Sequence, residues 1–197
     1  MIDAIYKRRS IRRFIQKPIE EDKLSAILEA GIWAPSEKNQ QPWKFVVIRG
    51  AARRDMVRCL KEGIAKNRGG DGIFSGYDQF IPSAVYTARI LEQAQAIVFV
   101  LNTEGFDPLA EKSPAERLKE CSDIQSISAA IQNMALAATD LGIGSLWTCN
   151  IFFAYHELKT WLAAEGEPVA ALALGYTDRE VRPMPRKPLS DVVLFRE

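Results

Sequence analysis

The chain has few of the residues on which many enzymes depend. Its 197 residues include one histidine and three cysteines, and no C-x-x-C pair occurs among Cys59, Cys121 and Cys149. This count argues against a disulfide framework and against a structural zinc site. With His156 alone and no G-x-S-x-G turn, the pattern of a Ser-His-Asp triad is also missing. We therefore expect reduced thiols, no bound metal, a surface or cap role for His156, and any enzymatic chemistry to be carried by a cofactor.

Long apolar runs and an excess of one charge are absent too. The longest apolar stretches, 96–101 and 169–174, are strand-length and far short of the roughly 18 residues that a spanning helix needs. Twenty-six Lys and Arg against 25 Asp and Glu give a net charge of +1, which offers no continuous basic track for nucleic acid. The N-terminus lacks the apolar region of a signal peptide. These features predict a cytoplasmic protein that binds neither membrane nor nucleic acid.

Helical and strand-like patterns mingle along the chain. Helical periodicity covers 20–33, 51–66, 83–93, 122–141 and 155–164. Apolar segments typical of strands lie at 43–48, 96–101, 145–151, 168–176 and 191–195. The glycines between positions 69 and 76 predict an irregular segment, and the weak periodicity of residues 102–114 predicts a loop. Because no linker, repeat or charge block divides the chain, we predict one α+β domain over residues 1–197.

The segment 122–141 differs from the other predicted helices in its few charges and many alanines. Such a helix is buried on most sides and lets another helix approach closely, so we expect it at the centre of the molecule or at a dimer interface. The C-terminal stretch, with Pro183, Pro185 and Pro188, cannot complete a compact core locally. We expect it to cross a surface or to reach a neighbouring subunit.

Two polar clusters are candidate binding segments. Five of the residues at positions 7–13 are Lys or Arg, which is often only a solvated face, but Arg8, Ser10 and Arg12 alternate and can form a compact anion cradle. The segment 34–43 combines two prolines with amides and a hydroxyl. Such groups recognise the polar edge of a heteroaromatic ring, although they are also common in a turn between a helix and a strand.

Two later motifs complete the set. Gly142 and Gly144 follow the long helix, and Trp147 stands where a dinucleotide fingerprint needs its third glycine, so the Rossmann interpretation fails. Gly142 is instead expected to end the helix in a left-handed conformation. A late basic group among the prolines is able to complete an anion site begun at Arg8. It consists of Arg179, Arg182, Arg186 and Lys187.

The order of these motifs is more specific than any one of them. Arg8-Arg-Ser-Ile-Arg-Arg-Phe14, Ala34-Pro-Ser-x-x-Asn-x-Gln-Pro-Trp43, Leu141-Gly-Ile-Gly-Ser-x-Trp147 and Leu174-Gly-Tyr before Pro185-Arg-Lys-Pro-Leu189 together resemble the nitroreductase family of FMN-dependent oxidoreductases. The resemblance spans nearly the whole chain. It implies a central, mostly antiparallel sheet flanked by helices. It also implies a homodimer with FMN at the subunit interface and a C-terminal extension wrapped around the partner.

The resemblance also implies which residues bind FMN. The phosphate would be held by Arg8, Arg9, Ser10, Arg186 and Lys187. Arg12 would face the ribityl chain and the pyrimidine edge, where a cation stabilises the negative charge of reduced flavin. The ring would receive, from the other subunit, Pro35, Ser36, Asn39 and Gln41. The N5 region would meet a backbone amide from the segment formed by Trp147, Thr148 and Cys149, with Cys149 favoured as a packing residue over a redox one.

The implied reaction is a ping-pong transfer of electrons from NAD(P)H through flavin N5 to a nitroaromatic, a quinone or a similar electron-poor small molecule. No side chain is then expected to act as a nucleophile. Acceptor choice would lie in 67–81 and 102–114, with Phe74, Tyr77, Phe80 and Phe106 as candidates for an aromatic lid. The alternatives are a divergent member, such as a reductive dehalogenase or a flavin-modifying enzyme, and a non-catalytic flavin- or RNA-binding protein.

Overall fold

A four-stranded antiparallel sheet forms the middle layer of the protein. The computed structural model describes residues 2–105, 107 and 110–197. The strands are β1 (Trp43–Arg49), β2 (Ala96–Asn102), β3 (Gly144–Thr148) and β4 (Glu167–Gly175), in the spatial order β1-β2-β4-β3. Each neighbouring pair is antiparallel. The predicted α+β class and its antiparallel sheet are therefore confirmed.

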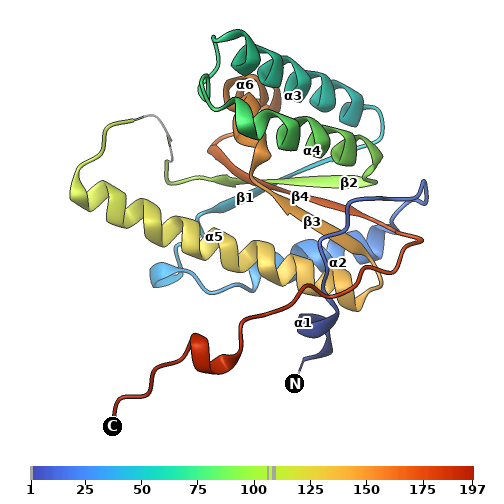
Figure 1. Cartoon of the computed structure of the whole chain (residues 1–197), viewed down its shortest axis with the longest axis vertical. Helices are drawn as coiled ribbons and strands as arrows, with labels where there is room; N and C mark the ends of the chain where they lie inside the picture. The colour runs from blue at the N-terminus through green and yellow to red at the C-terminus, as the bar shows by residue number, and fades with distance from the viewer. Residues whose placement is uncertain (1, 106, 108–109) are drawn as a thin grey trace.

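Helices cover both faces of this sheet (Figure 1). One layer contains α3 (Ala52–Gly69), α4 (Ile81–Gln93) and α6 (Tyr155–Leu162), and the other contains α2 (Glu21–Ile32) and the long α5 (Pro114–Asp140). A short α1 (Asp3–Lys7) precedes them. Side chains of the buried strand β2 alternate between the two cores, with Phe99 packed toward α3 and α4 and Val98 toward α2 and α5.

The long helix α5 begins eight residues earlier than the periodicity at 122–141 predicts. Its first two turns are exposed and charged, so they carry no apolar stripe. They are instead stabilised by a capping box, in which the Ser113 hydroxyl accepts a hydrogen bond from the Glu116 amide and the Glu116 carboxylate accepts one from the Ser113 amide. At the other end Gly142 adopts the predicted left-handed conformation, with φ 73°.

Two predicted strands are corrected by the structure. The one at 145–151 ends at Thr148, and a 3-10 helix, η3 (Asn150–Ala154), follows after Cys149. The strand predicted at 191–195 is wrong: the 3-10 helix η4 (Leu189–Asp191) is followed by irregular chain. A strand needs a neighbouring strand to pair with, and this segment lies apart from the sheet (Figure 1).

Residues 177–197, here called the C-terminal arm, leave the body after β4 (Figure 1). From position 178 onward every residue of the arm is exposed. The arm carries large apolar side chains, among them Leu194 and Phe195, which are 79% and 80% exposed. Within the protomer it therefore has no core of its own.

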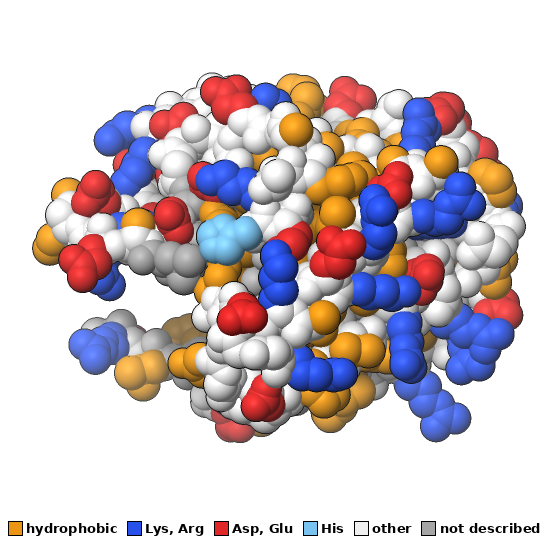
Figure 2. Space-filling view, turned by 90° about the horizontal axis from the view of Figure 1, so that it is seen from above, with side chains coloured by type: hydrophobic (Ala, Val, Ile, Leu, Met, Phe, Trp, Pro, Cys, Tyr) orange, Lys and Arg blue, Asp and Glu red, His pale blue; other side chains and the backbone are white. Residues whose placement is uncertain are grey.

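The outer face of α3, α4 and α6 carries Lys and Arg interspersed with Asp and Glu (Figure 2). His156 is exposed on this side, as the pale blue side chain shows, which confirms its expected surface position. Among the helices built from described residues, none combines the length and the apolar character needed to cross a membrane.

Candidate functional site

The basic N-terminal segment lies beside the edge strand β3. Ser10 forms an isolated parallel bridge with Ser145, and the Ile11 amide donates to the Ser145 carbonyl at 2.8 Å. Gly144 permits this approach, because a Cβ there would lie 2.7 Å from Ile11 Cγ1. Ile11 is buried in the core between the sheet and α3 and α4. Packing of Ile11 thus fixes the backbone on which the flanking polar residues are carried.

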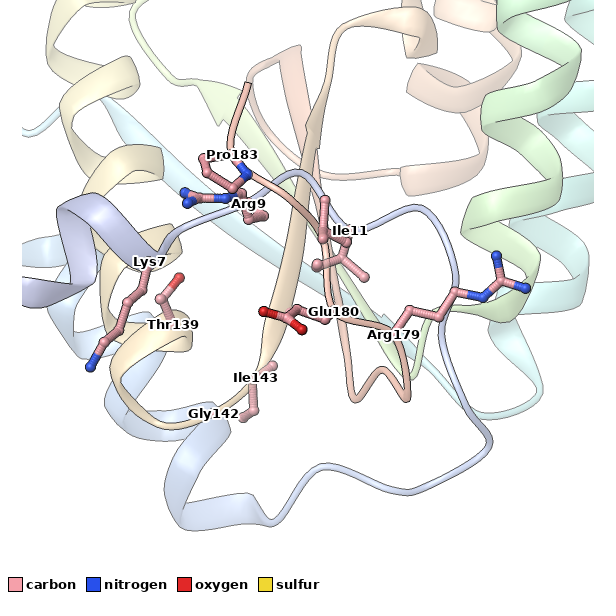
Figure 3. Close-up of a pocket in the computed structure, with 11 residues that line it drawn as sticks. Lys7, Arg9, Ile11, Thr139, Gly142, Ile143, Arg179, Glu180 and Pro183 are labelled. Carbon is pink, nitrogen blue, oxygen red and sulfur yellow. The ribbon is translucent and has the colours of Figure 1, made fainter. Parts of the chain in front are cut away.

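The extended segment sends alternate side chains into two different pockets. Arg8 and Ser10 line a pocket of about 400 Å³, here called the Arg8 pocket. Arg9 and Ile11 line a separate pocket of about 350 Å³, here called the Arg9 pocket, together with Lys7 and Arg179 (Figure 3). This division follows from the two-residue period of extended chain. Both pockets gather residues from more than one candidate segment: the Arg9 pocket adds Gly142, Gly144 and Arg179, whereas the Arg8 pocket adds Trp147 and Cys149 of the segment predicted to face the flavin N5 region.

The Arg8 pocket combines a cation, short hydroxyls, an amide and an aromatic surface. Its lining residues are Arg8, Ser10, Gln132, Ala135, Ser145, Trp147 and Cys149. Guanidinium and hydroxyl donors bind the oxygens of an anion, and the Trp147 indole, 38% exposed, offers an apolar surface to a ring. This chemistry suits a ligand that carries both a phosphate and a planar heteroaromatic system.

Three of these lining residues are not among the predicted site residues. Gln132 lies in the charge-poor middle of α5 beside Asn133, whose side chain instead donates to the Ala30 carbonyl at 3.1 Å, and Ala135 lies one turn further along the same helix. Ser145 lies on β3 at the bridge to Ser10. Polar residues inside a charge-poor buried helix are the available signal in the sequence, but Asn133 carries it as well, so the pattern does not single out Gln132.

Arg9 and Arg12 are placed away from the Arg8 pocket. Arg9 donates from Nη1 to the carbonyls of Tyr6 and Arg8 at 2.6 and 2.7 Å, so its side chain braces the N-terminal turn. Arg9 can therefore contribute to the Arg8 pocket only through its backbone. Arg12 is exposed and donates to the Ser10 carbonyl at 3.3 Å.

The predicted ring-binding segment lies against α5 in a constrained conformation. The Ser36 hydroxyl accepts from the Gln41 amide at 2.9 Å, and the Ser122 hydroxyl donates to the Glu37 carboxylate at 2.7 Å. Asn39 and Gln41 have positive φ angles of 58° and 52°, which is uncommon for residues other than glycine. Such strain concentrates where a segment binds a ligand or a partner. Pro35, Ser36, Asn39 and Gln41 do not line the Arg8 pocket of their own protomer.

The predicted phosphate residues of the C-terminal arm are also separate from the Arg8 pocket. Arg186 and Lys187 are exposed, and Arg186 donates to the carbonyls of Met184 and Pro185 at 3.0 and 3.2 Å. The protomer therefore brings Arg8 and Ser10 together but does not bring Arg186 to them.

The segment predicted to face the flavin N5 region closes one side of the Arg8 pocket. Thr148 is buried, and its hydroxyl accepts from the Asn150 amide at 3.1 Å. Cys149 is exposed in the protomer, yet the protein atoms around its thiol desolvate it and raise its pKa. A thiol that stays protonated at neutral pH is a weak nucleophile, which favours the packing role.

The candidate lid residues divide into two kinds. Phe74 is partly buried and packs on Phe153 with ring centroids 5.2 Å apart, so it belongs to the core. Tyr77 and Phe80 are each 52% exposed and are free to meet another surface. Phe106 lies outside the described residues.

The fold and the pocket define an α+β protein with a layered antiparallel sheet and a pocket lined by a guanidinium, hydroxyls, an amide and an indole. The model of the family described as "Nitroreductase family" matches residues 5–176, so the chain belongs to the nitroreductase family. The resemblance seen in the motifs, and the fold that it implies, are confirmed.

Individual relatives agree with this membership. A relative from Archaeoglobus fulgidus with the provisional name "NADH dehydrogenase/NAD(P)H nitroreductase" is 34% identical over 74% of this chain and 65% of its own length. The chain thus spans slightly less than two thirds of that relative. The "NADH dehydrogenase" of Thermus thermophilus is 30% identical over 98% of this chain and 94% of its own length. A structure of a provisionally named nitroreductase in complex with FMN from Desulfovibrio desulfuricans is 32% identical, covers 99% of this chain and 95% of its own, and has a TM-score of 0.69.

Proposed function

We propose that the protein is an FMN-dependent oxidoreductase that passes electrons from NAD(P)H to nitroaromatic, quinone or similar electron-poor small molecules in a ping-pong reaction. The observation that carries this proposal is the Arg8 pocket, where Arg8, Ser10, Trp147 and Cys149 from two distant segments meet. The FMN bound by the Desulfovibrio relative and the nicotinamide-linked names of the Archaeoglobus and Thermus relatives support the same activity.

The residues of the pocket match the parts of FMN. Arg8 and Ser10 lie on one side of an extended segment, where a guanidinium and a hydroxyl can bind one phosphate. Gln132 presents an amide and Trp147 an aromatic surface toward the same space. FMN, when bound, would supply the capacity to accept two electrons from NAD(P)H and to donate them to the second substrate. The chain's own residues bind and orient this cofactor and its substrates.

The proposed active unit is a homodimer. Asn39 and Gln41 are exposed in a constrained segment that does not serve its own Arg8 pocket, and a second subunit would receive them. Trp33, just after α2, and Leu118 on α5 are 78% and 73% exposed, and apolar side chains of this size favour being covered by another protein surface. The C-terminal arm would wrap around the partner and place Arg186 and Lys187 near a phosphate.

Three measurements on the purified protein test this function. A flavin absorption spectrum, followed by release of the chromophore and its identification as FMN, tests the cofactor. Oxidation of NADH or NADPH that depends on an added nitroaromatic or quinone tests turnover, and a yellow protein without turnover would instead be a flavin carrier. A colourless protein that does not bind added FMN would contradict the proposal, and salt-dependent RNA binding by it would favour the RNA-binding alternative.

Alkylation of the cysteines tests the position of the cofactor without any activity measurement. Cys149 lines the Arg8 pocket, whereas Cys121 lies on the exposed N-terminal half of α5. FMN should slow the alkylation of Cys149, as followed by peptide mass mapping, and leave Cys121 unchanged as the internal control. Equal rates at Cys149 with and without bound FMN would place the cofactor elsewhere.

A further inference from the structure

Asn150 joins the wall of the Arg8 pocket to a helix on the far side of the sheet. Its side-chain amide donates to the hydroxyl of Thr87 at 2.7 Å and to that of Ser83 at 3.1 Å. Its backbone amide donates to the Thr148 hydroxyl at 3.1 Å. Asn150 directly follows Cys149, a lining residue of the pocket. One residue thus holds the end of the pocket wall in three hydrogen bonds.

The acceptors of Asn150 are themselves well fixed. Ser83 and Thr87 are four residues apart on α4, so both hydroxyls lie on the same face of the helix. Thr87 is buried at 6% exposure, and Thr148 is buried as well. The bond from the half-buried Asn150 amide to the buried Thr87 hydroxyl is costly to leave unmade, because that hydroxyl has little access to water, whereas the exposed Ser83 hydroxyl can exchange Asn150 for water.

The opposite end of η3 is held by a different residue. The Asn67 side chain, on α3, donates to the Phe153 carbonyl at 2.7 Å and accepts from the Phe74 amide at 2.6 Å. Asn67 is buried and is not a lining residue of the Arg8 pocket. The two asparagines therefore hold the same short helix, but only Asn150 adjoins the residues that face the ligand.

We propose that Asn150 is a positioning residue that fixes the wall Trp147–Cys149 against α4 and so sets how this wall meets the flavin. The proposal rests on the proposed function and on the expectation, implied by the family resemblance, that a backbone amide of this wall lies by the flavin N5 region. The charge on the flavin ring changes with its oxidation state, so a displaced hydrogen-bond donor alters the binding of the oxidised and reduced forms unequally. The relative affinity of the two forms, and thus the midpoint potential, reports the position of the wall.

The test compares the midpoint potential and the visible circular dichroism of bound FMN in the wild type and in variants on both sides of the contact. Asn150→Ala and Thr87→Val should each change the ratio of affinities for reduced and oxidised FMN by three- to tenfold, where tenfold equals about 30 mV for a two-electron couple. The double variant should shift no further than the larger single variant, because both remove the same bond. Thr87→Ser, which keeps the hydroxyl, should behave as the wild type.

Asn67→Ala is the matched control for a merely structural role. It should lower the melting temperature at least as much as Asn150→Ala does, yet leave the potential and the flavin circular dichroism unchanged. An unchanged potential in both Asn150→Ala and Thr87→Val, or an equal shift in Asn67→Ala, would overturn the role of Asn150 while FMN binding stands. A wild-type protein that binds no FMN would instead overturn the proposed function on which this inference rests.

Discussion

The N-terminal segment 8–15 and the C-terminal arm are both irregular and both carry predicted phosphate ligands, but they differ in what holds them. Ile11 and Phe14 of the first segment are buried, and its backbone bonds to Ser145 and Tyr176. In the arm, Leu194 and Phe195 are exposed, and the hydrogen bonds of Arg186 stay within the arm. The body of the protomer therefore buries the apolar side chains of the first segment, whereas it leaves Leu194 and Phe195 of the arm exposed.

The difference lies in the surface that receives each segment. Gly144 and Gly175 open the edge of the sheet, since a Cβ at either glycine would press on Ile11 or Phe14. The first residues of the arm line the Arg9 pocket, but Leu194 and Phe195 stay exposed, and exposed apolar side chains of this size favour being covered by another protein surface. Under the proposed function, Arg8 and Ser10 form the half of the phosphate site that the protomer builds itself, and Arg186 belongs to the half that a second subunit would complete.

Removal of the arm should have the largest effect on the protein. A chain that ends at Tyr176 keeps the whole sheet and both cores, so its far-ultraviolet circular dichroism and cooperative melting should persist. It should lose the dimer and weaken FMN binding by two orders of magnitude or more, since the arm and the partner's ligands are lost together. Light scattering after size exclusion and FMN titration measure the two losses.

A truncated chain that keeps the full-length oligomeric mass and FMN affinity would show that the arm is dispensable. A chain that ends at Phe195 is the matched control, because it removes only the final two residues, and it should behave as the full-length protein.

One apolar substitution in the body and one in the C-terminal arm should show which residues stabilise the fold and which stabilise the dimer. Met134 on α5 is fully buried and lies next to Gly31 of α2, so Met134→Ala should reduce the free energy of unfolding by about 2–5 kcal/mol. Leu194→Ala in the arm should instead weaken dimerisation and leave the free energy of unfolding of residues 1–176 unchanged. Denaturant unfolding and the concentration dependence of the mass distinguish the two.

Equal losses of unfolding free energy in Met134→Ala and in Leu194→Ala, at one protein concentration, would mean that the arm folds as part of the body.

The sequence predicts those parts of the molecule that depend on local periodicity. The helices α2 to α6, apart from the first two turns of α5, the four sheet strands and the left-handed Gly142 follow from residue patterns within a few turns, whereas α1 was not predicted. Alternation also places Arg8 and Ser10 on one side of the segment, as the pocket confirms. Local patterns do not reveal contacts between distant segments, which is why Gln132 and Ser145 were not predicted to line the same pocket.

The C-terminal arm shows a feature that local sequence patterns do not predict. Residues 191–195 have the composition of a strand, but a strand forms only where another strand pairs with it. The same limit applies to Arg9: its charge predicts an anion contact, whereas the bridge to β3 turns its side chain into the other pocket.

Loss of a single phosphate contact should have an intermediate effect. Arg8→Ala removes a charge-assisted hydrogen bond worth about 1.5–3 kcal/mol, which corresponds to FMN binding about 10- to 150-fold weaker. Arg186→Ala should give a loss of the same order only if the arm brings Arg186 to the phosphate in the dimer. Equilibrium titration with FMN measures both.

Arg13→Ala, at an exposed arginine of the same cluster, is the control and should leave FMN affinity within twofold of the wild type. Unchanged affinity in both Arg8→Ala and Arg186→Ala would refute the phosphate site.

The smallest effect is expected at Tyr176, the last residue before the arm. Its hydroxyl donates to the Glu20 carboxylate and, with Lys23 nearby, lowers the pKa of Glu20 to about 2 from an ordinary 4.5. A carboxyl pKa lowered by folding contributes stability above pH 4.5 and loses it as the pH falls toward 2. Tyr176→Phe should therefore melt below the wild type at pH 7, with a gap that closes between pH 4.5 and 2. Tyr86→Phe, at an exposed tyrosine of α4, should show no such gap, and a constant gap in Tyr176→Phe down to pH 2 would mean that Glu20 is not its cause.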